Sequence, residues 1–471
     1  MNLEETKCNL DLTWEVVKKA EHEFAGKPIL GSNNPEEIKA ALDLGFPSTP
    51  QGFNHILSDF ESQILPFLNR NTDVRFGAYI TGSGSRISAL AEFIKAFFNQ
   101  NGLKWNNSPI TSELEQLVIQ WISEFVDLPA FKKGILTSGG SMSNLMAIHF
   151  ALASKFPGRE MKGLYAEKPF TIYCSNQTHS SVDRAMVFLG LGREFLRKID
   201  VNEQYEIDVE KLREVIQSDV DRGLQPLMLI GNAGTTNTGS LDDLVSLAAV
   251  AKAFDLWYHV DGAYGLPARR LPELREKFNG IEHADSITIN PHKWMYVTFE
   301  ASCVLLKKIP AAINFSPDYL FTEDPGLRWE SSEHTIELSK EFRALKIWFT
   351  MKYYGAAQLT DFVKHDIELI AYLADQLKKR TNFEVERHHP LSILCFRWID
   401  NTKSEQELEK ININAVRQVE SNGEIFITGT KLGGKTYLRV YYGNPDRTEA
   451  DVEHMISKID KVFEQVLAIT S

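Results

Sequence analysis

The feature that most constrains the fold of this chain is a regular alternation of short apolar runs with amphipathic helical segments, beginning at Gly134. Short apolar runs bounded by turn residues predict buried strands, and strands that alternate with helices predict a largely parallel sheet flanked by helices. In such sheets ligands bind beyond the carboxyl ends of the strands, so the residues that follow each run are the candidates for chemistry. The predicted strands are residues 135–137, 170–174, 227–230, 256–260, 286–289 and 303–306.

The pattern divides the chain into three predicted regions. Residues 1–75 alternate helical and turn-rich pieces and are expected to form an N-terminal helical arm that contacts a partner subunit. Residues 76–338 form the large α/β domain, in which the capping-box pattern of Ser112 and Glu115 predicts the start of a helix. Residues 339–471 read as a small α+β domain that opens with a long helix at Phe342 and ends in a helix over 451–467.

Charge and cysteine content exclude several classes of protein. A net charge of −12 opposes nonspecific binding to nucleic acid or to an anionic membrane. The four cysteines are far apart and form no CxxC pair, which predicts free thiols and neither a disulfide framework nor a metal site. The N-terminus is charged and no stretch of about 18 apolar residues occurs, so neither a secretory signal nor a membrane span is predicted and the cytoplasm is the expected location.

A glycine-rich turn follows the first predicted strand, at residues 138–144, and leads into a helical run. Glycines let an anion approach the backbone, the free N–H groups at a helix N-terminus attract negative charge, and Ser141 adds a hydroxyl donor. The turn is therefore a candidate phosphate site. A plain strand-to-helix turn with a serine cap is the alternative.

Two charged residues stand just after later strands. Asp261 could pair with the cationic ring nitrogen of pyridoxal 5′-phosphate (PLP), unless it only caps the next element. Lys293, between His292 and Trp294, could form a Schiff base with the PLP aldehyde if a partly desolvated position lowers its pKa. A solvated surface lysine is the alternative.

The phosphate turn, the acid and the lysine occur in the order expected for a PLP site. Here the sequence resembles the group II PLP-dependent amino-acid decarboxylases, which include aromatic-amino-acid, histidine, glutamate and cysteine-sulfinate decarboxylases. The resemblance runs from about Arg75 to the C-terminus. It is carried by the motifs at residues 138–145, 177–183, 234–239, 259–264 and 290–294.

The resemblance implies a type I PLP fold, a homodimer with active sites at the subunit interface, and decarboxylation of an L-amino acid to an amine and carbon dioxide. It implies that Lys293, Asp261 and His179 are the catalytic residues, with His179 stacked on the pyridine ring. A purely structural histidine, and an arginine on an exposed strand face, are the alternatives for His179 and Arg439. The implied cofactor contacts are Gly140, Ser141, His179, Thr235, Asp261, Ala263, His292 and Lys293, and the implied substrate contacts are Ile80, Thr81, Trp105 and Arg439.

One departure from the family pattern concerns the mobile lid, whose tyrosine returns a proton to the α-carbon in aromatic-amino-acid decarboxylases. The corresponding residues 324–336 contain no tyrosine; Ser331 falls near the expected position, and His334 is the nearest candidate donor. Altering that tyrosine within the family can divert the reaction toward oxygen, giving an aldehyde, ammonia and peroxide. Oxidative decarboxylation therefore stays open, as do other type I reactions such as retro-aldol cleavage or transamination, and no particular substrate is indicated.

Residues 429–436 satisfy the phosphate-loop pattern of nucleotide hydrolases. That loop must open a helix, whereas Thr436 leads into a strand-like run that follows another at 425–428, so a β-hairpin turn is predicted. Nucleotide binding and a catalytically inert scaffold with this fold remain remote alternatives; the scaffold would be expected to have lost Lys293.

Overall fold

The computed structural model describes residues 1–24, 26–31, 34–164, 167–310, 328–387 and 390–470. Its centre is a seven-stranded sheet in the order β1-β7-β6-β5-β4-β2-β3. All pairings are parallel except those of β7, which runs antiparallel to both β1 and β6. The predicted, largely parallel sheet is thus confirmed. The strands are β1 Lys133–Thr137, β2 Phe170–Ser175, β3 Leu196–Ile199, β4 Gln225–Asn232, β5 Trp257–Asp261, β6 Ser286–Ile289 and β7 Ser302–Leu306.

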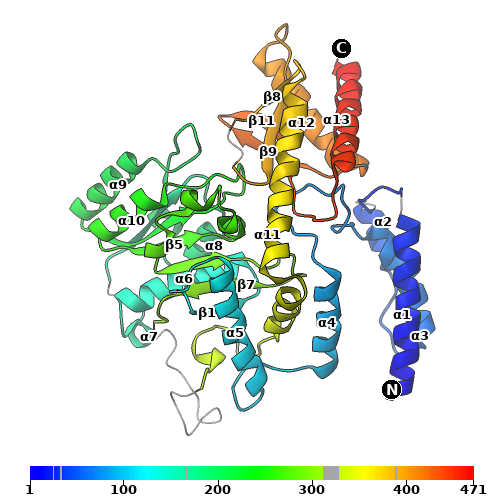
Figure 1. Cartoon of the computed structure of the whole chain (residues 1–471), viewed down its shortest axis with the longest axis horizontal. Helices are drawn as coiled ribbons and strands as arrows, with labels where there is room; N and C mark the ends of the chain where they lie inside the picture. Colours follow the sequence, from blue (N-terminus) through cyan, green and yellow to red (C-terminus); the bar gives the residue numbers. More distant parts are fainter. Residues whose placement is uncertain (25, 32–33, 165–166, 311–327, 388–389, 471) are drawn as a thin grey trace.

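Helices cover both faces of this sheet (Figure 1). Side chains alternate along β4: Met228 and Ile230 pack with the helices α6 and α8, whereas Leu229 packs in the core that contains α5, α9 and α10. A strand buried on both faces needs apolar residues at every position, which is why the runs are continuous. The helices are α5 Pro109–Phe125, α6 Gly140–Lys155, α7 Arg159–Lys162, α8 Ser181–Phe188, α9 Val209–Asp221 and α10 Leu244–Ala253.

The start of α5 differs from the prediction. The helix begins at Pro109 after Ser108, so Ser112 and Glu115 lie inside it and the predicted capping box is wrong. Proline at the first helical position has a suitable φ and lacks only an N–H that would be unpaired there, which favours the earlier start. Glu115 is instead buried, and its Oε1 accepts hydrogen bonds from the backbone N–H of Leu136 (3.0 Å) and from Nζ of Lys340 (2.7 Å).

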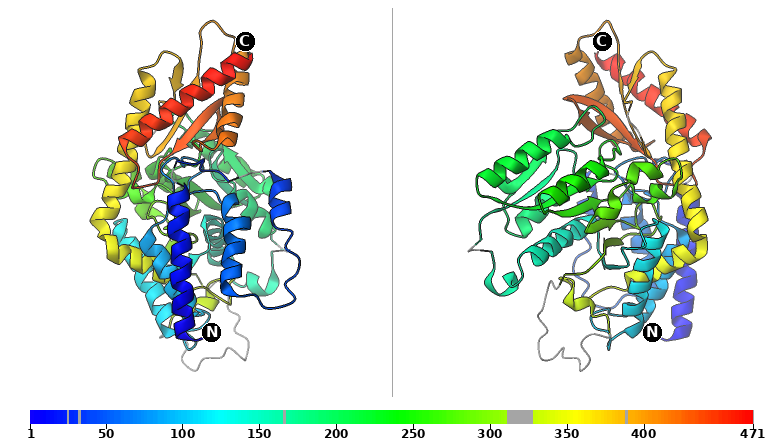
Figure 2. Two further views of the ribbon diagram at one scale, coloured as in Figure 1. Left: turned by 90° about the vertical axis from the view of Figure 1, so that its right-hand side faces the viewer. Right: turned by 60° about the vertical axis from the view of Figure 1, so that its left-hand side comes forward.

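A second, antiparallel sheet lies in the C-terminal part, in the order β10-β11-β9-β8. Helix α11, Arg343–Lys378, extends from the large sheet to this small one, and Phe342 is its N-cap residue, close to the predicted start (Figures 1 and 2). Helices α12 and α13 pack with the small sheet in one apolar core. The elements are β8 Phe383–Val385, β9 Ile393–Trp398, α12 Glu405–Asn422, β10 Thr428–Leu432, β11 Lys435–Tyr441 and α13 Glu449–Thr470.

The phosphate-loop-like motif at 429–436 forms the hairpin between β10 and β11, as predicted, although β10 begins only at Thr428. Gly433 and Gly434 make the turn with positive φ values of 54° and 81°. Lys435 pairs with Glu405 (3.4 Å), and the Thr436 hydroxyl donates to Glu409 (2.7 Å). In a phosphate loop the lysine would bind phosphate and the threonine would bind the metal. Here Lys435 and Thr436 bind carboxylates instead.

The N-terminal arm consists of α1 Leu3–Phe24, α2 Pro35–Ala41 and α3 Phe53–Asp59, and it is followed by α4 Arg86–Phe98. In Figure 1 the arm stands at one side of the molecule, with α4 between α1 and the rest of the large domain. Large apolar side chains on α1 and α4 are exposed, among them Trp14 and Phe98. The domain limits at 75 and 338 stay predictions. Within the described residues, no helix combines the length and apolarity that a membrane span requires.

Candidate active site

Three candidate catalytic residues lie at the carboxyl end of the parallel strands. Asp261 ends β5, Lys293 follows β6, and His179 stands in the turn between β2 and α8. Burial lowers the pKa of Lys293, and the charge of Asp261 opposes this effect. Burial also lowers the pKa of His179, which is in turn raised by Asp261 and lowered by Lys293. The three groups therefore lie within reach of one another's charge, as the motif order predicted.

Lys293 is not a solvated surface lysine. The residue is half-buried, and among the described residues no hydrogen bond or ion pair engages its amine. The backbone around it is closely packed, because a Cβ on Gly82 would come within 2.2 Å of the Lys293 carbonyl oxygen. A desolvated amine with a lowered pKa is neutral more often at pH 7, which is the form that attacks an aldehyde.

The Asp261 carboxylate is held by two N–H donors. Its Oδ2 accepts from Nδ2 of Asn144 (2.8 Å), and its Oδ1 accepts from the backbone N–H of Ala263 (3.1 Å). The side chain is only 8% exposed, so it does more than cap a surface turn. Asn144 was not among the predicted site residues; its signal was a polar residue inside the apolar helical run after the glycine-rich turn.

The glycine-rich turn places the N-terminus of α6 at the same edge of the sheet. The helix begins at Gly140, and within the described chain no side chain caps it. A Cβ on Gly140 would lie 2.9 Å from Nδ2 of Asn290, so any other residue here would force the buried Asn290 side chain to shift. Ser141 is exposed at the first turn. The uncapped helix end suits a phosphate group, and the alternative of a serine-capped turn does not hold.

His292 lies beside this turn as a neutral imidazole. Its Nδ1 accepts a hydrogen bond from the Ala301 N–H (3.1 Å), so Nε2 carries the ring proton and can donate. Burial lowers the pKa of His292 to about 3, and the charge of Lys293 adds to this effect. A neutral donor of this kind can hydrogen-bond a phosphate oxygen.

His179 stands on the wall of the site with its imidazole accessible to solvent, although the surrounding protein is close enough for desolvation to lower its pKa. Its Nδ1 accepts from the Ser181 N–H (3.2 Å). Thr235 is buried, and its hydroxyl accepts from the Ser240 N–H (3.1 Å). Ala263 is half-buried, two residues after Asp261.

The groups at this edge of the sheet match the functional parts of PLP. Among the described residues, the site offers an amine with no partner for the aldehyde, an uncapped helix N-terminus for the phosphate and a buried carboxylate for the ring nitrogen. Each group suits one part of the cofactor. No contact among the described residues accounts for all three groups together. The residues present fit the cofactor.

The four candidate substrate residues do not all meet at this site. Arg439 on β11 is 6% exposed, which excludes an exposed strand face, and its charge contributes to lowering the pKa of Lys293. It donates to the Thr428 hydroxyl (3.1 Å) and the Tyr79 carbonyl (3.0 Å), while its Nε has no partner among the described residues. Ile80 is buried and Thr81 half-buried in the adjoining segment. Trp105 instead lies against α5, with its indole N–H donating to Glu113 (3.0 Å).

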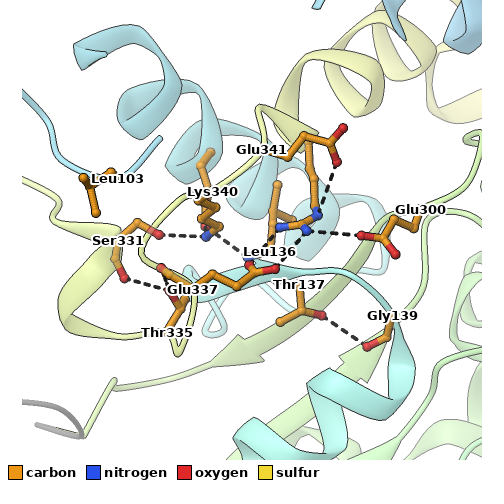
Figure 3. A network of polar contacts seen from close by, with 12 residues as sticks. Leu103, Leu136, Thr137, Gly139, Glu300, Ser331, Thr335, Glu337, Lys340 and Glu341 are labelled. Carbon is orange, nitrogen blue, oxygen red and sulfur yellow. Dashed lines mark hydrogen bonds and ion pairs between the residues drawn. The ribbon is translucent and has the colours of Figure 1, made fainter. Parts of the chain in front are cut away.

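The two lid candidates, Ser331 and His334, contact other residues of the chain, and Figure 3 shows the contacts of Ser331. Residues 324–327 of the predicted lid lie outside the described residues. Ser331 is buried in the short 3₁₀ helix Ser331–Glu333, and its hydroxyl accepts from Nζ of Lys340 (2.8 Å). His334 stacks on Trp329 at 4.5 Å, and burial lowers its pKa to about 4. Neither side chain is arranged as a proton donor at pH 7, and their proposed roles stay predictions.

The histidine environments predict a dependence of stability on pH. An unfolded histidine titrates near its ordinary pKa of about 6.5, whereas folded His334 titrates near 4. The unfolded state therefore binds more protons in this window, so stability is fully present above pH 6.5 and is lost as the pH falls toward 4. Urea unfolding at pH 7 and at pH 5 measures the unfolding free energy that each protein loses between these two pH values. His334→Gln should lose up to about 2 kcal/mol less than wild type. Equal losses would contradict the prediction.

The fold and the site together define a PLP-dependent enzyme of fold type I. The model of the pyridoxal-dependent decarboxylase conserved domain matches residues 35–399, and the chain therefore belongs to that family. It is accordingly a PLP-dependent carboxy-lyase, with PLP as its cofactor.

Similar proteins with known names agree with this assignment. An aromatic-L-amino-acid decarboxylase of Bacillus atrophaeus is 31% identical, with 86% of each chain covered. A phenylacetaldehyde synthase of Arabidopsis thaliana is 29% identical, covering 90% of this chain and 89% of the relative. The crystal structure of Oryza sativa TDC with PLP and tryptamine superposes with a TM-score of 0.93 over 99% of both chains, at 24% identity, which supports the fold alone.

Proposed function

We propose that the protein decarboxylates an L-amino acid to the corresponding amine and carbon dioxide. The observation that carries this proposal is the desolvated Lys293 amine of a half-buried residue, which has no partner within the described residues and lies within reach of the charges of Asp261 and Arg439. Bound PLP supplies an electron sink for the bond that breaks at the α-carbon. The groups of this chain determine which bond that is.

The proposed roles follow from the positions of the side chains. With PLP bound, Lys293 would hold the cofactor aldehyde, and Asp261 would keep the ring nitrogen protonated. His179 covers one face of the ring and excludes water there. Arg439 binds the α-carboxylate, because a buried guanidinium with an unpartnered Nε gains most from an anionic ligand. Holding that carboxylate perpendicular to the ring selects decarboxylation over other cleavages.

Replacing Arg439 with glutamine should separate substrate binding from the rest of the site. A charge-assisted hydrogen bond contributes about 1.5–3 kcal/mol, so KM for the amino acid should rise roughly 10- to 100-fold. The amine product lacks the carboxylate, and its inhibition constant should stay unchanged. Lys431→Gln, on the exposed end of β10, is the control. A parallel loss of affinity for amino acid and amine would argue against carboxylate binding.

Oxidative decarboxylation to an aldehyde is the second candidate. The observation that favours it is that the Ser331 hydroxyl, near the lid tyrosine position, accepts a hydrogen bond from Lys340, while His334 is neutral at pH 7. One similar protein bears the name phenylacetaldehyde synthase. This reaction consumes one oxygen and one water per amino acid and releases carbon dioxide, ammonia and hydrogen peroxide with the aldehyde.

One experiment separates the candidates. Purified protein with added PLP is incubated with a panel of amino acids, aromatic ones first because of the relatives' names, and with cysteine sulfinate and diaminobutyrate. Mass spectrometry of the products is combined with oxygen and peroxide measurements. An amine without oxygen uptake supports decarboxylation, and an aldehyde with equimolar peroxide supports the oxidative reaction. Neither product from any amino acid would overturn both candidates.

We also propose a homodimer in a reducing compartment such as the cytoplasm. Exposed Phe93, Phe97 and Phe98 on α4 form an apolar patch, and Trp14 on α1 is exposed as well; a second copy would cover these side chains. The four cysteines are unpaired within the described residues, which suits a reducing compartment. Sedimentation velocity measures the mass: a dimer is expected, and a monomer at micromolar concentration would contradict the proposal.

A further inference from the structure

Asn144 is a buried amide, only 2% exposed, with every hydrogen-bonding position filled. Its Nδ2 donates to Oδ2 of Asp261 (2.8 Å) and to the Ser181 hydroxyl (2.9 Å). Its Oδ1 faces Nε2 of His259 (3.3 Å) and accepts from the Thr288 hydroxyl (3.0 Å). Helix α6 thereby contacts the ends of β5 and β6 and the start of α8 through a single side chain.

The direction of these contacts is fixed at the Asp261 end. The carboxylate of Asp261 requires donors, so Asn144 must present Nδ2 to it and Oδ1 to His259. Nε2 of His259 therefore carries the proton, and its Nδ1 accepts from Oγ of Ser286 (2.8 Å). The Trp257 indole can only donate, so the same Ser286 oxygen accepts from it (2.8 Å). The donors of Trp257, Ser286, His259 and Asn144 all point toward Asp261.

The same amide also reaches the turn that carries His179. Ser181 accepts from Asn144 through its hydroxyl and donates its backbone N–H to Nδ1 of His179 (3.2 Å). Asp261 and His179 would contact the cofactor ring at its nitrogen and at its face. The Asn144 side chain therefore hydrogen-bonds both to Asp261 and to the turn that carries His179, and it fixes the two residues relative to each other.

We propose that Asn144 is a positioning residue: it ends a directed hydrogen-bond chain from Trp257 through Ser286 and His259 that fixes the Asp261 carboxylate toward the cofactor ring nitrogen, and it aligns the turn of His179. The inference rests on the proposed roles of Asp261 and His179. Hydrogen bonds aligned in this way polarise one another, so each bond is stronger, and they keep a negatively charged oxygen of Asp261 facing the ring nitrogen. Burial keeps His259 neutral by lowering its pKa to about 4, which preserves this direction across the working pH range.

The test uses the holoenzyme loaded with PLP that carries ¹⁵N in the ring. The ¹⁵N chemical shift reports the protonation of the ring nitrogen between pH 6 and 9. In Asn144→Leu, which matches the volume but removes all four bonds, the ring nitrogen should lose its proton at lower pH. PLP should dissociate roughly 10- to 100-fold more readily, the range usual for removing such supporting contacts. With an active substrate, kcat should fall while KM stays, because Arg439 is untouched.

Asn412→Leu is the matched control. Asn412 is also a fully buried asparagine with its amide satisfied, by the Trp398 backbone and the Leu408 carbonyl, but it lies in the small domain. A merely structural role predicts that both variants lose stability and that neither changes the ¹⁵N shift. An unchanged shift and PLP affinity in Asn144→Leu would overturn the inference.

If Asn144→Leu does not fold, two variants of His259 decide the question. His259→Gln keeps a donor near the position of Nε2, whereas His259→Phe removes it. The inference expects the ¹⁵N shift to move in the phenylalanine variant and to be largely restored in the glutamine variant; equal shifts in both would overturn it. The shift and the PLP affinity do not depend on turnover, so failure of the proposed reaction would remain distinguishable from failure of this inference.

Discussion

Replacing Lys293 with alanine is expected to lower turnover by at least about 10³-fold, within the range that a positioned proton-transfer group alone contributes. The amine is the nucleophile proposed to hold the cofactor, and burial lowers its pKa as that role requires. Borohydride reduction and peptide mass spectrometry should find the pyridoxyl group on Lys293 in wild type and nowhere in the variant. The exposed Lys308→Ala is the control.

The same substitution makes an unusual prediction for stability. A desolvated amine with no partner costs free energy in the folded protein, so its removal should leave the cofactor-free protein as stable as wild type or more stable. Loss of activity with an unchanged or raised Tm would show that Lys293 serves catalysis and not stability. Full activity, or the pyridoxyl group on another lysine, would contradict the proposed site.

Replacing Lys340 with methionine is expected to destabilise the protein by about 3–5 kcal/mol, because it leaves the buried carboxylate of Glu115 without its counter-ion. Lys340 is the centre of the network in Figure 3: its amine donates to Glu115 (2.7 Å) and to Ser331 (2.8 Å). Urea unfolding of the single variants Lys340→Met and Glu115→Gln and of the double variant measures the coupling. The double variant should lose less than the sum of the two single losses, and additive losses would refute the coupling.

Much of the site could be predicted because its chemistry is local in the sequence. Asp261 and Lys293 each follow an apolar run directly, and ligands bind at the carboxyl ends of parallel strands, so the sequence alone places both residues at one edge of the sheet. The sequence motif could not tell whether either residue was solvated. The missing information was burial, which separates Lys293 from an ordinary surface lysine.

The errors and omissions arose from contacts between distant segments. Ser112 and Glu115 matched a local capping pattern, but Pro109 starts the helix earlier and Glu115 binds Lys340, 225 residues away. Strand β3 was missed because two charged residues interrupt its short apolar pattern. The one signal of Asn144, a polar residue in an apolar helical run, did not reveal its partners, since Asp261 and Thr288 approach it only when the sheet has formed.

The antiparallel strand β7 has a consequence for the order in which the molecule assembles. Strand β1 lies at the edge of the sheet and, in the part of the chain that the structure describes, pairs with β7 alone. Ser143 and Ser302, which link α6 to β7 at 2.7 Å, are 159 residues apart in the sequence. Closing so long a segment carries an entropic cost and slows the pairing. The glycine-rich turn after β1 can therefore reach its final position only after almost the whole large domain has been synthesised. We therefore expect a nascent chain to retain the cofactor only late in its synthesis, after most of the other strands have paired.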